Sequence, residues 1–266
     1  MFVPNTTSRP NPDLSIPQNG QLICTMLTHI PLLFLIFKSF HNLIKGEPTG
    51  LWFTLGGLIS SACEPILDVM GFCFFPRPGN WIAFEFFGRP IPYFVIPTYG
   101  WYVGGQGYLF LTIIQNKKTT RSVVLGLWLR SFIANLILEY TAMYFGMFVY
   151  YGYQPFAVRG FPLWFPAIHS TAPVLAAVVV HMLEGQLEGM RSPVIGIIVA
   201  TLYPMVNAGF GWPVWCALSL DRGLHVTYPA ACITAGLIAT GLWIATLPFA
   251  ETRAKAGGKS LNGKVA

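Results

Sequence analysis

The chain has 266 residues, of which 54% are hydrophobic and only 10% are charged. An ordinary soluble domain carries roughly a quarter charged residues, so this composition excludes a single water-soluble globule. Disorder is excluded too, because 15% of the chain is aromatic. The net charge of +6 comes from basic residues scattered over short loops and a tail, which is not a nucleic-acid-binding pattern. The composition therefore predicts one integral-membrane domain over residues 1–266.

Seven stretches are long and apolar enough to cross a bilayer, which takes about 20 residues per helix. In chain order, the predicted spans are residues 22–44, 50–71, 91–114, 123–150, 163–183, 194–218 and 226–249. We expect the first to be a true span and not a cleaved signal peptide, since no charged segment directly precedes it and no small-residue cleavage site follows. The predicted fold is all-α, a seven-transmembrane helix bundle with a basic tail at residues 250–266.

The lysines and arginines divide unequally between the two sides of this bundle. The N-terminal side holds five, namely Arg9, Arg77, Arg89, Arg159 and Arg222. The opposite side holds ten, namely Lys38, Lys45, Lys117, Lys118, Arg121, Arg191, Arg253, Lys255, Lys259 and Lys264. Because the more basic side usually faces the cytoplasm, we expect a cytoplasmic C-terminus and an N-terminus that is outside or lumenal. In a eukaryote, we expect the protein in the membrane of the endoplasmic reticulum. The sequon at Asn5-Thr6-Thr7 agrees with this orientation.

Two long connections on the N-terminal side are rich in aromatic residues, Pro and Gly. They read FCFFPRPGNWIAFEFFGRPIP after the second predicted span and YGYQPFAVRGFPLWF after the fourth. Interfacial Trp and Tyr belts account for some of these residues. Seven aromatic residues between Phe72 and Phe87 exceed what a belt needs, so we expect a lid or vestibule there.

Two acids lie one turn apart in the second predicted span, where each costs about 2.5–3.5 kcal/mol on insertion scales. Glu64 and Asp68 share one helical face, and Gly57, Ser60 and Ser61 extend the same small and polar stripe. Two carboxyls so close together in a low dielectric do not both ionise easily. The spacing therefore favours one as a protonated general acid and the other as a base or orienting group.

Other polar residues reach the same half of the predicted bundle. Glu139 and Asn135 lie one turn apart in the fourth span, His169 lies in the fifth, Asn207 in the sixth, and Asp221 follows the sixth. We expect these groups to converge with the acids of the second span on one cavity. The structural alternative is that the acids and the histidine only hydrogen-bond between helices, and that the aspartate caps a helix.

Motifs for several enzyme classes are missing from the sequence. It contains no Walker A loop, HExxH, GxSxG, DDxxD or DxDD, no pair of His at metal-binding spacing and no CxxC. We therefore do not expect a Mg²⁺-dependent ionisation of a diphosphate. The GxxxG at Gly100 and Gly104 favours close approach of another helix.

The segments EPILDVMGFCFFPRPGNWIAFEFFGRPIPYFV, GWYVGG and YFGMFVYYGYQPFAVRGFPLWF resemble two groups of small membrane cyclases. One is the membrane-bound terpene cyclases of fungal meroterpenoid biosynthesis, and the other is the AveC-type spirocyclases of bacteria. The resemblance implies acid catalysis on a lipophilic substrate, with neither a metal nor a redox cofactor. Indole-diterpene cyclases carry one essential acid early and another late in the chain. Glu64 and Asp221 are placed like these, although the local motif here is CEPILD.

The leading hypothesis is a terpenoid cyclase that closes rings on a prenyl or epoxy-prenyl chain of a meroterpenoid or related metabolite. Glu64 is the expected proton donor, Asp68 its assistant, and Asp221 or Glu139 the partner acid or base, with His169 as a further catalytic candidate. The expected substrate-binding residues are Trp81, Phe84, Trp101, Tyr102, Asn135, Trp164, Asn207 and Trp212. The expected partners are a lipophilic small molecule, membrane lipid and upstream pathway enzymes, and not nucleic acid.

Two alternatives remain open from the sequence. The first is an AveC-like spiroketal cyclase or dehydratase that acts on a polyketide. The second is a non-enzymatic receptor or proton-linked carrier, in which the same acids bind a ligand or a proton.

Overall fold

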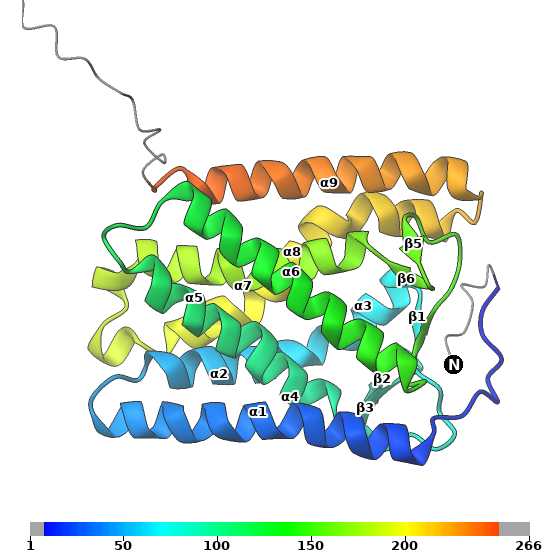
Figure 1. Ribbon diagram of the computed structural model, residues 1–266, viewed down its shortest axis with the longest axis horizontal. Coiled ribbons are helices and arrows are strands. Elements are labelled where there is room, and N and C mark those ends of the chain that lie inside the picture. Colours follow the sequence, from blue (N-terminus) through cyan, green and yellow to red (C-terminus); the bar gives the residue numbers. More distant parts are fainter. Residues whose placement is uncertain (1–7, 250–266) are drawn as a thin grey trace, which may run out of the picture.

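The computed structural model describes residues 8–249, and its helices run mainly along the long axis of the molecule (Figure 1). The Asn5 sequon and the basic tail at residues 250–266 lie outside the described residues. The α-helices are α1 (Gln18–Ile44), α2 (Thr49–Ser60), α3 (Glu64–Gly71), α4 (Val95–Tyr99), α5 (Gln106–Ile114), α6 (Arg121–Tyr144), α7 (Trp164–Met182), α8 (Val194–Ser219) and α9 (Leu224–Thr246). The remaining turns are the 3₁₀ segments η1 (Ser61–Cys63), η3 (Glu184–Gln186) and η4 (Gly189–Arg191), and the π-helical segment η2 (Gly100–Gly105).

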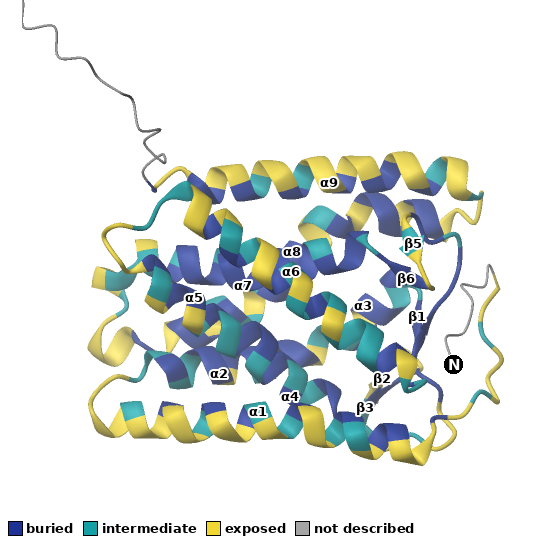
Figure 2. Cartoon of the chain, in the orientation of Figure 1, coloured by how far each residue is buried: buried dark blue, intermediate teal, exposed yellow. Residues whose placement is uncertain are grey.

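Six helical segments of the described chain are long and apolar enough to cross a membrane. They are α1, α2 together with α3, α6, α7, α8 together with η4, and α9. Their length and composition indicate a multi-pass membrane protein. Figure 2 shows exposed residues on the outward faces of α1 and α9, and many of these are large and apolar, as lipid contact requires.

The predicted third span at residues 91–114 has a different structure from the other six. Its first two residues belong to strand β3 (Arg89–Pro92), and α4, η2 and α5 then follow one another without a gap from residue 95 to residue 114. The π-helical turn of η2 interrupts the regular α-helix, so neither α4 nor α5 is long enough alone to count as a span. The fourth span is also shorter than predicted, because α6 ends at Tyr144 and a strand follows.

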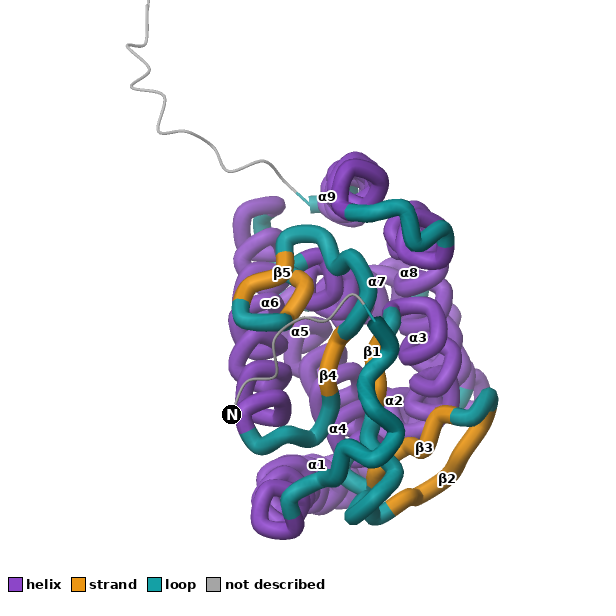
Figure 3. Tube along the Cα trace, turned by 90° about the vertical axis from the view of Figure 1, so that its right-hand side faces the viewer, coloured by secondary structure: helices purple, strands orange, loops and turns teal. Residues whose placement is uncertain are grey.

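Short antiparallel strands close one end of the bundle, which we call the strand end (Figure 3). The three pairs are β1 (Cys73–Phe74) with β4 (Val149–Tyr150), β2 (Ile82–Phe86) with β3, and β5 (Ala157–Val158) with β6 (Phe161–Pro162). The first pair joins the first aromatic-rich connection, which contains β1, to the residues directly before the second, which form β4.

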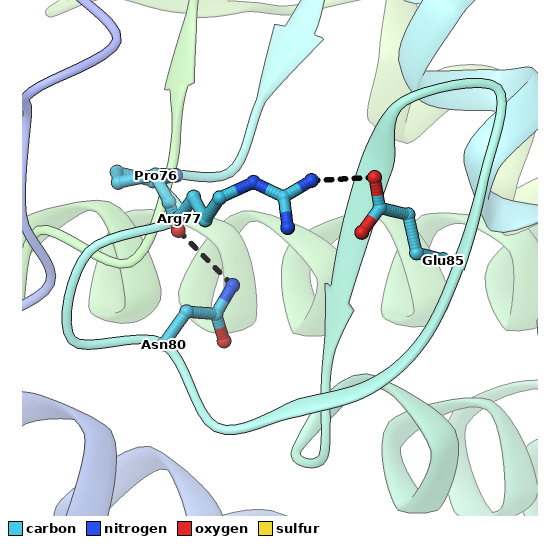
Figure 4. Close-up of polar contacts among 4 residues, drawn as sticks. All are labelled: Pro76, Arg77, Asn80 and Glu85. Carbon is cyan, nitrogen blue, oxygen red and sulfur yellow. Dashed lines mark hydrogen bonds and ion pairs between the residues drawn. The ribbon is translucent and has the colours of Figure 1, made fainter.

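The loop between β1 and β2 is held in shape by its own polar contacts (Figure 4). Arg77 and Glu85 form an ion pair with an N–O distance of 2.5 Å, and the Asn80 amide donates to the Pro76 carbonyl at 3.1 Å. The segment before α1 is tied to the same loop, because the Ile16 backbone N–H donates to the Pro78 carbonyl at 2.9 Å. The connection is therefore an ordered covering of the strand end.

The most buried helix is α7, which packs against α5, α6, α8 and α9. A second tight contact joins α2 to η2, and it uses the glycines of the predicted GxxxG. A Cβ placed on Gly104 would lie 2.3 Å from the Phe53 carbonyl oxygen, and one placed on Gly57 would lie 2.7 Å from the Gly104 nitrogen. The expected close approach is confirmed, and it fixes the position of η2 against the helix that leads to Glu64.

Candidate functional site

A cavity of about 90 Å³ lies in the half of the bundle nearest the strand end. Its wall includes parts of α1, α3, the α4–α5 segment, α6, α7 and α8. The acidic, amide and imidazole side chains in this wall are Glu64, Asp68, Asn135, Glu139 and His169. Aromatic rings form much of the remainder, namely Phe75, Phe94, Tyr99, Tyr102, Phe148, Tyr150, Phe165 and Tyr203. The space holds a few water molecules or one small chemical group.

A 3₁₀ turn, η1, lies between α2 and α3, directly before the two acids of this segment. The Ser60 hydroxyl donates to the Gly57 carbonyl and the Ser61 hydroxyl to the Leu58 carbonyl, each at 2.7 Å, so both hydroxyls are satisfied within the helix. Pro65 in the first turn of α3 has no N–H to continue the helical ladder. After this turn, α3 presents Glu64 and Asp68 to the cavity.

Each cavity glutamate accepts a hydrogen bond from a tyrosine. The Tyr99 hydroxyl donates to Glu64 Oε2, and the Tyr150 hydroxyl donates to Glu139 Oε2 at 3.2 Å. Tyr150 lies in β4, and burial together with the nearby Glu139 carboxyl raises the pKa of its hydroxyl well above the ordinary value. That hydroxyl therefore stays protonated and remains a donor. The two bonds fix the carboxyls while leaving their other oxygens for a ligand.

The π-helical segment η2 supplies a further hydroxyl to the cavity. The Tyr102 hydroxyl lies 3.2 Å from Ser131 Oγ and 3.4 Å from Ser170 Oγ, so it bridges α6 and α7. Short π-helical segments are rare and often occur at functional sites. The glycines of this segment, GWYVGG, let it lie directly against α2.

Three buried polar atoms of the cavity have no hydrogen-bond partner among residues 8–249. They are Asp68 Oδ2, Asn135 Oδ1 and His169 Nε2. The imidazole is also enclosed by rings, with the Phe165 centroid 4.2 Å away and the Tyr203 centroid 5.5 Å away. A buried polar atom without a partner costs about 1–3 kcal/mol, so these atoms point to a bound polar group or water in the cavity.

A buried arginine lies behind Asp68. Arg89 is in β3, its Nη2 donates to the Tyr151 hydroxyl at 2.9 Å, and its charge acts on the Asp68 carboxyl. Cys73 lies beside the same carboxyl, and burial raises the pKa of its thiol well above the ordinary value. This thiol therefore stays protonated at neutral pH. Among the described residues, Arg89 is thus the cation nearest these acids. Arg77, by contrast, is exposed and paired with Glu85.

The structure brings together six of the residues that the sequence singled out. Glu64, Asp68, Glu139, His169, Asn135 and Tyr102 all line the one cavity. They come from α3, α6, α7 and η2, which are distant in sequence. Their roles remain predictions.

The other predicted site residues lie elsewhere. Asp221 is exposed in the turn after α8, where its φ is +50°, so it stands in a left-handed helix-ending position away from the cavity. Trp81 and Trp212 are exposed at 40% and 54%, because the first lies on the surface before β2 and the second points outward from α8.

Four more of the predicted substrate-binding residues are in the packed structure beside the cavity and not in its wall. The Trp164 indole N–H donates to Gln154 Oε1 at 3.1 Å, and the Asn207 amide donates to the Tyr203 carbonyl at 2.9 Å. Phe84 and Trp101 are half-buried against the core. Their roles in binding a substrate remain predictions.

Sequence reasoning missed the tyrosines that hold the glutamates, Tyr99 and Tyr150, and the ring of Tyr203. A signal existed, since a tyrosine in an apolar segment needs a partner for its hydroxyl and an intramembrane acid needs a donor. The pairing between them depends on the β1–β4 contact and on the π-helical turn, which periodicity does not reveal.

No protein-family model matches the chain, and neither a curated protein nor a solved structure matches it. The site's own geometry must therefore support any function. Within the described part of the chain, no group of three or more His, Cys, Asp or Glu side chains is arranged to hold a metal ion.

Replacing Arg89 by Met should lower the free energy of unfolding by about 1.5–3 kcal/mol, because it removes a charged hydrogen bond and leaves Asp68 facing no cation. The thermal unfolding midpoint of the purified protein in detergent measures this. The matched control is Arg77→Met in the neighbouring exposed loop, which should shift the midpoint little. Equal shifts for the two variants would contradict a buried electrostatic role for Arg89.

Proposed function

We propose that this protein is an integral-membrane terpenoid cyclase that closes rings on a prenyl or epoxy-prenyl chain by acid catalysis. The observation that carries the proposal is the grouping of three carboxyls, those of Glu64, Asp68 and Glu139, in one largely aromatic cavity of apolar helices. The resemblance of the segment from EPILD to FPLWF to membrane-bound terpene cyclases supports the same reading. The substrate would be a lipophilic small molecule taken from the membrane.

The carboxyls have the chemistry that such a reaction needs. Ionising all three would place three negative charges in one low-dielectric chamber, where the charge of Arg89 acts on Asp68 and not on the two glutamates, so at least one carboxyl keeps its proton. That proton is transferred to the epoxide oxygen or terminal alkene, and the resulting cation is attacked by an internal double bond. A neighbouring carboxylate removes a proton from the last cation, which restores the acid and base between them.

Glu64 is the proposed donor and Asp68 the group that supports it. Glu64 Oε2 is occupied by the Tyr99 hydroxyl, so its other oxygen remains for the substrate. Asp68 lies one helical turn from Glu64 in the same cavity wall, so it is placed to exchange a proton with it. Glu139 lies on α6 and accepts the hydrogen bond from Tyr150. It is the proposed second acid or base, because Asp221 lies outside the cavity.

The aromatic wall suits a reaction that passes through carbocations. Rings stabilise a nearby cation by about 0.5–2 kcal/mol per contact, and a dry site limits capture of the cation by water. Phe165, Tyr203 and Phe148 are the rings we propose for this role, in place of the tryptophans that lie outside the cavity. Since the cavity is smaller than a typical ligand pocket of about 300–1,000 Å³, it takes only the reacting end of the chain as it stands.

The proposed topology has seven crossings. Residues 95–114 are helical throughout and would form the seventh, beside the six helices already long enough to span. The strand end and N-terminus would lie outside or in the lumen, with the more basic connections in the cytoplasm. A cysteine placed at exposed Phe86 should then react with a membrane-impermeant maleimide from the outside of intact cells if the strand end lies outside the cell. If the strand end lies in the lumen, the same cysteine should react only after both the plasma membrane and the organelle membrane are permeabilised.

The direct test is conversion of a prenylated phenol epoxide by membranes that contain the protein. We expect a ring-closed product with the mass of the substrate, formed without added nucleotide or ion gradient. Membranes from cells without the protein are the control. No product from this epoxide or from the corresponding alkene, together with uptake driven by a pH gradient in proteoliposomes, would contradict the proposal and favour a carrier.

A further inference from the structure

The lining of the cavity is buried toward the strand end and partly exposed toward the side of the bundle. Its wall on the strand side consists of buried residues, among them Cys73, Phe75, Phe148 and Tyr150. The lining residues that are not buried are Leu27, Glu64, Thr98, Leu138, Glu139 and Thr141. Apart from the two glutamates inside, these belong to α1, α4 and α6.

The arrangement of α1 and α6 explains this exposure. In Figure 1, α6 runs diagonally, in nearly the same direction as α5 and α4, and its end approaches the start of α1 near the strand end. The contact there is tight, because a Cβ on Gly20 would lie 2.7 Å from the Phe145 carbonyl oxygen just after α6. Farther along, α1 packs on α2 and α4, while α6 packs on α7. The two helices therefore diverge, with the α4–α5 segment behind the gap.

The surface around this gap is apolar. Leu27, at the gap itself, is 52% exposed, and Phe34 on α1 and Ile137 on α6 are 68% and 65% exposed. Side chains of this kind face the acyl chains in a membrane-spanning bundle. A molecule entering here comes from the bilayer and not from water.

The cavity behind the gap is equipped for one polar group. Asp68 Oδ2, Asn135 Oδ1 and His169 Nε2 are buried without a partner in the described chain, and they belong to residues that are 2%, 1% and 6% exposed. An apolar passage that ends in such atoms matches an amphiphile with a single apolar chain and one hydrogen-bonding end.

We infer that an amphiphile with a single apolar chain enters from the bilayer between α1 and α6, through a portal formed by Leu27, Thr98, Leu138 and Thr141. Its polar end meets Asn135, His169 and Asp68, and its tail remains in the portal between the helices. The small volume of the cavity is then sufficient, because only the polar end and the first carbons need to be inside. This inference concerns binding, so it stands whether or not ring closure follows.

The test uses a farnesol that carries a photoactivated diazirine, added to the full-length protein in lipid vesicles. After irradiation, mass spectrometry should find label on cavity residues such as Tyr102 and Asn135, and unlabelled farnesol should compete with it. Leu27→Trp and Leu138→Trp fill the portal and should lower cavity labelling at short times by about tenfold, because entry is slowed. Leu27→Ala should raise it.

The controls are Leu33→Trp and Ile133→Trp, which enlarge side chains that are 62% and 49% exposed on the same two helices but do not line the cavity. Both should label as the unchanged protein does. Unfolding midpoints verify that all variants are folded, and the opposite effects of Trp and Ala at Leu27 separate blocking from misfolding. The inference would be overturned if the portal variants left cavity labelling unchanged, or if label were found only on the outward faces of the helices. Neither result depends on turnover, so failure of the proposed cyclisation would be seen separately.

Discussion

Replacement of Glu64 by Gln should lower the rate of ring closure by about 10²–10⁴-fold, the usual contribution of a general acid. Glutamine has the same shape and still accepts the hydrogen bond from Tyr99, so the cavity wall should stay in place. It cannot release a proton to an epoxide or alkene. The measurement is initial-rate product formation from the prenylated phenol epoxide, in membranes matched for the amount of protein.

The control for this variant is Glu188→Gln, the same chemical change at an exposed residue between η3 and η4. This residue does not line the cavity. It should leave the rate unchanged. Glu139→Gln supplies the comparison inside the cavity, where the Tyr150 bond is likewise preserved. Full activity in Glu64→Gln with a large loss in Glu139→Gln would transfer the donor role to Glu139 and reject the assignment made here.

The chemistry of the bundle is readable in the sequence because charge is so costly within apolar spans. Ten of 266 residues are Asp or Glu, so an acid in the middle of an apolar run is a distinct signal. Glu64, Asp68 and Glu139 stood out for that reason, and the structure places them in one cavity. The apolar runs likewise predicted the six long helical segments, and most of the predicted helix ends lie within a few residues of the observed ones.

The aromatic residues were harder to assign, because a ring is equally at home in a cavity wall, a packed core or a lipid-facing surface. Trp212 and Trp164 have similar local sequence surroundings, yet one is exposed and the other is buried against Gln154. Their directions depend on helix rotation and on the β1–β4 pairing between loops distant in sequence. Periodicity within a single segment contains neither piece of information.

The π-helical turn shows a related limit. The sequence GWYVGG indicated close packing, and that packing is present, but nothing in its pattern distinguishes an α-turn from a π-turn. The turn decides how Tyr99 and Tyr102 are presented to the cavity. Asp221 differs from its expected place, because we expected it beside the cavity acids while its backbone puts it in an exposed turn.

Replacement of Gly104 by Val should prevent most of the protein from folding. The first added carbon alone would lie 2.3 Å from the Phe53 carbonyl oxygen and 2.9 Å from its carbonyl carbon. Both atoms belong to the backbone of α2, so no side chain can turn away to make room. We expect a loss of more than about 3 kcal/mol in the free energy of unfolding, the upper end of ordinary overpacking, measured as loss of monodisperse protein and a lower unfolding midpoint in detergent.

The same contact connects stability to the site, because Gly104 holds η2 against the helix that leads through Gly57 to Glu64. Gly104→Ala, the milder change, should leave some folded protein in which the bond from Tyr99 to Glu64 is strained and ring closure is slower. Gly126→Val on α6 is the matched control, since a Cβ at Gly126 meets nothing within 4 Å. Equal unfolding midpoints for the valine variants at positions 104 and 126 would show that α2 and η2 can separate freely, and the positioning of Glu64 described here would then be untenable.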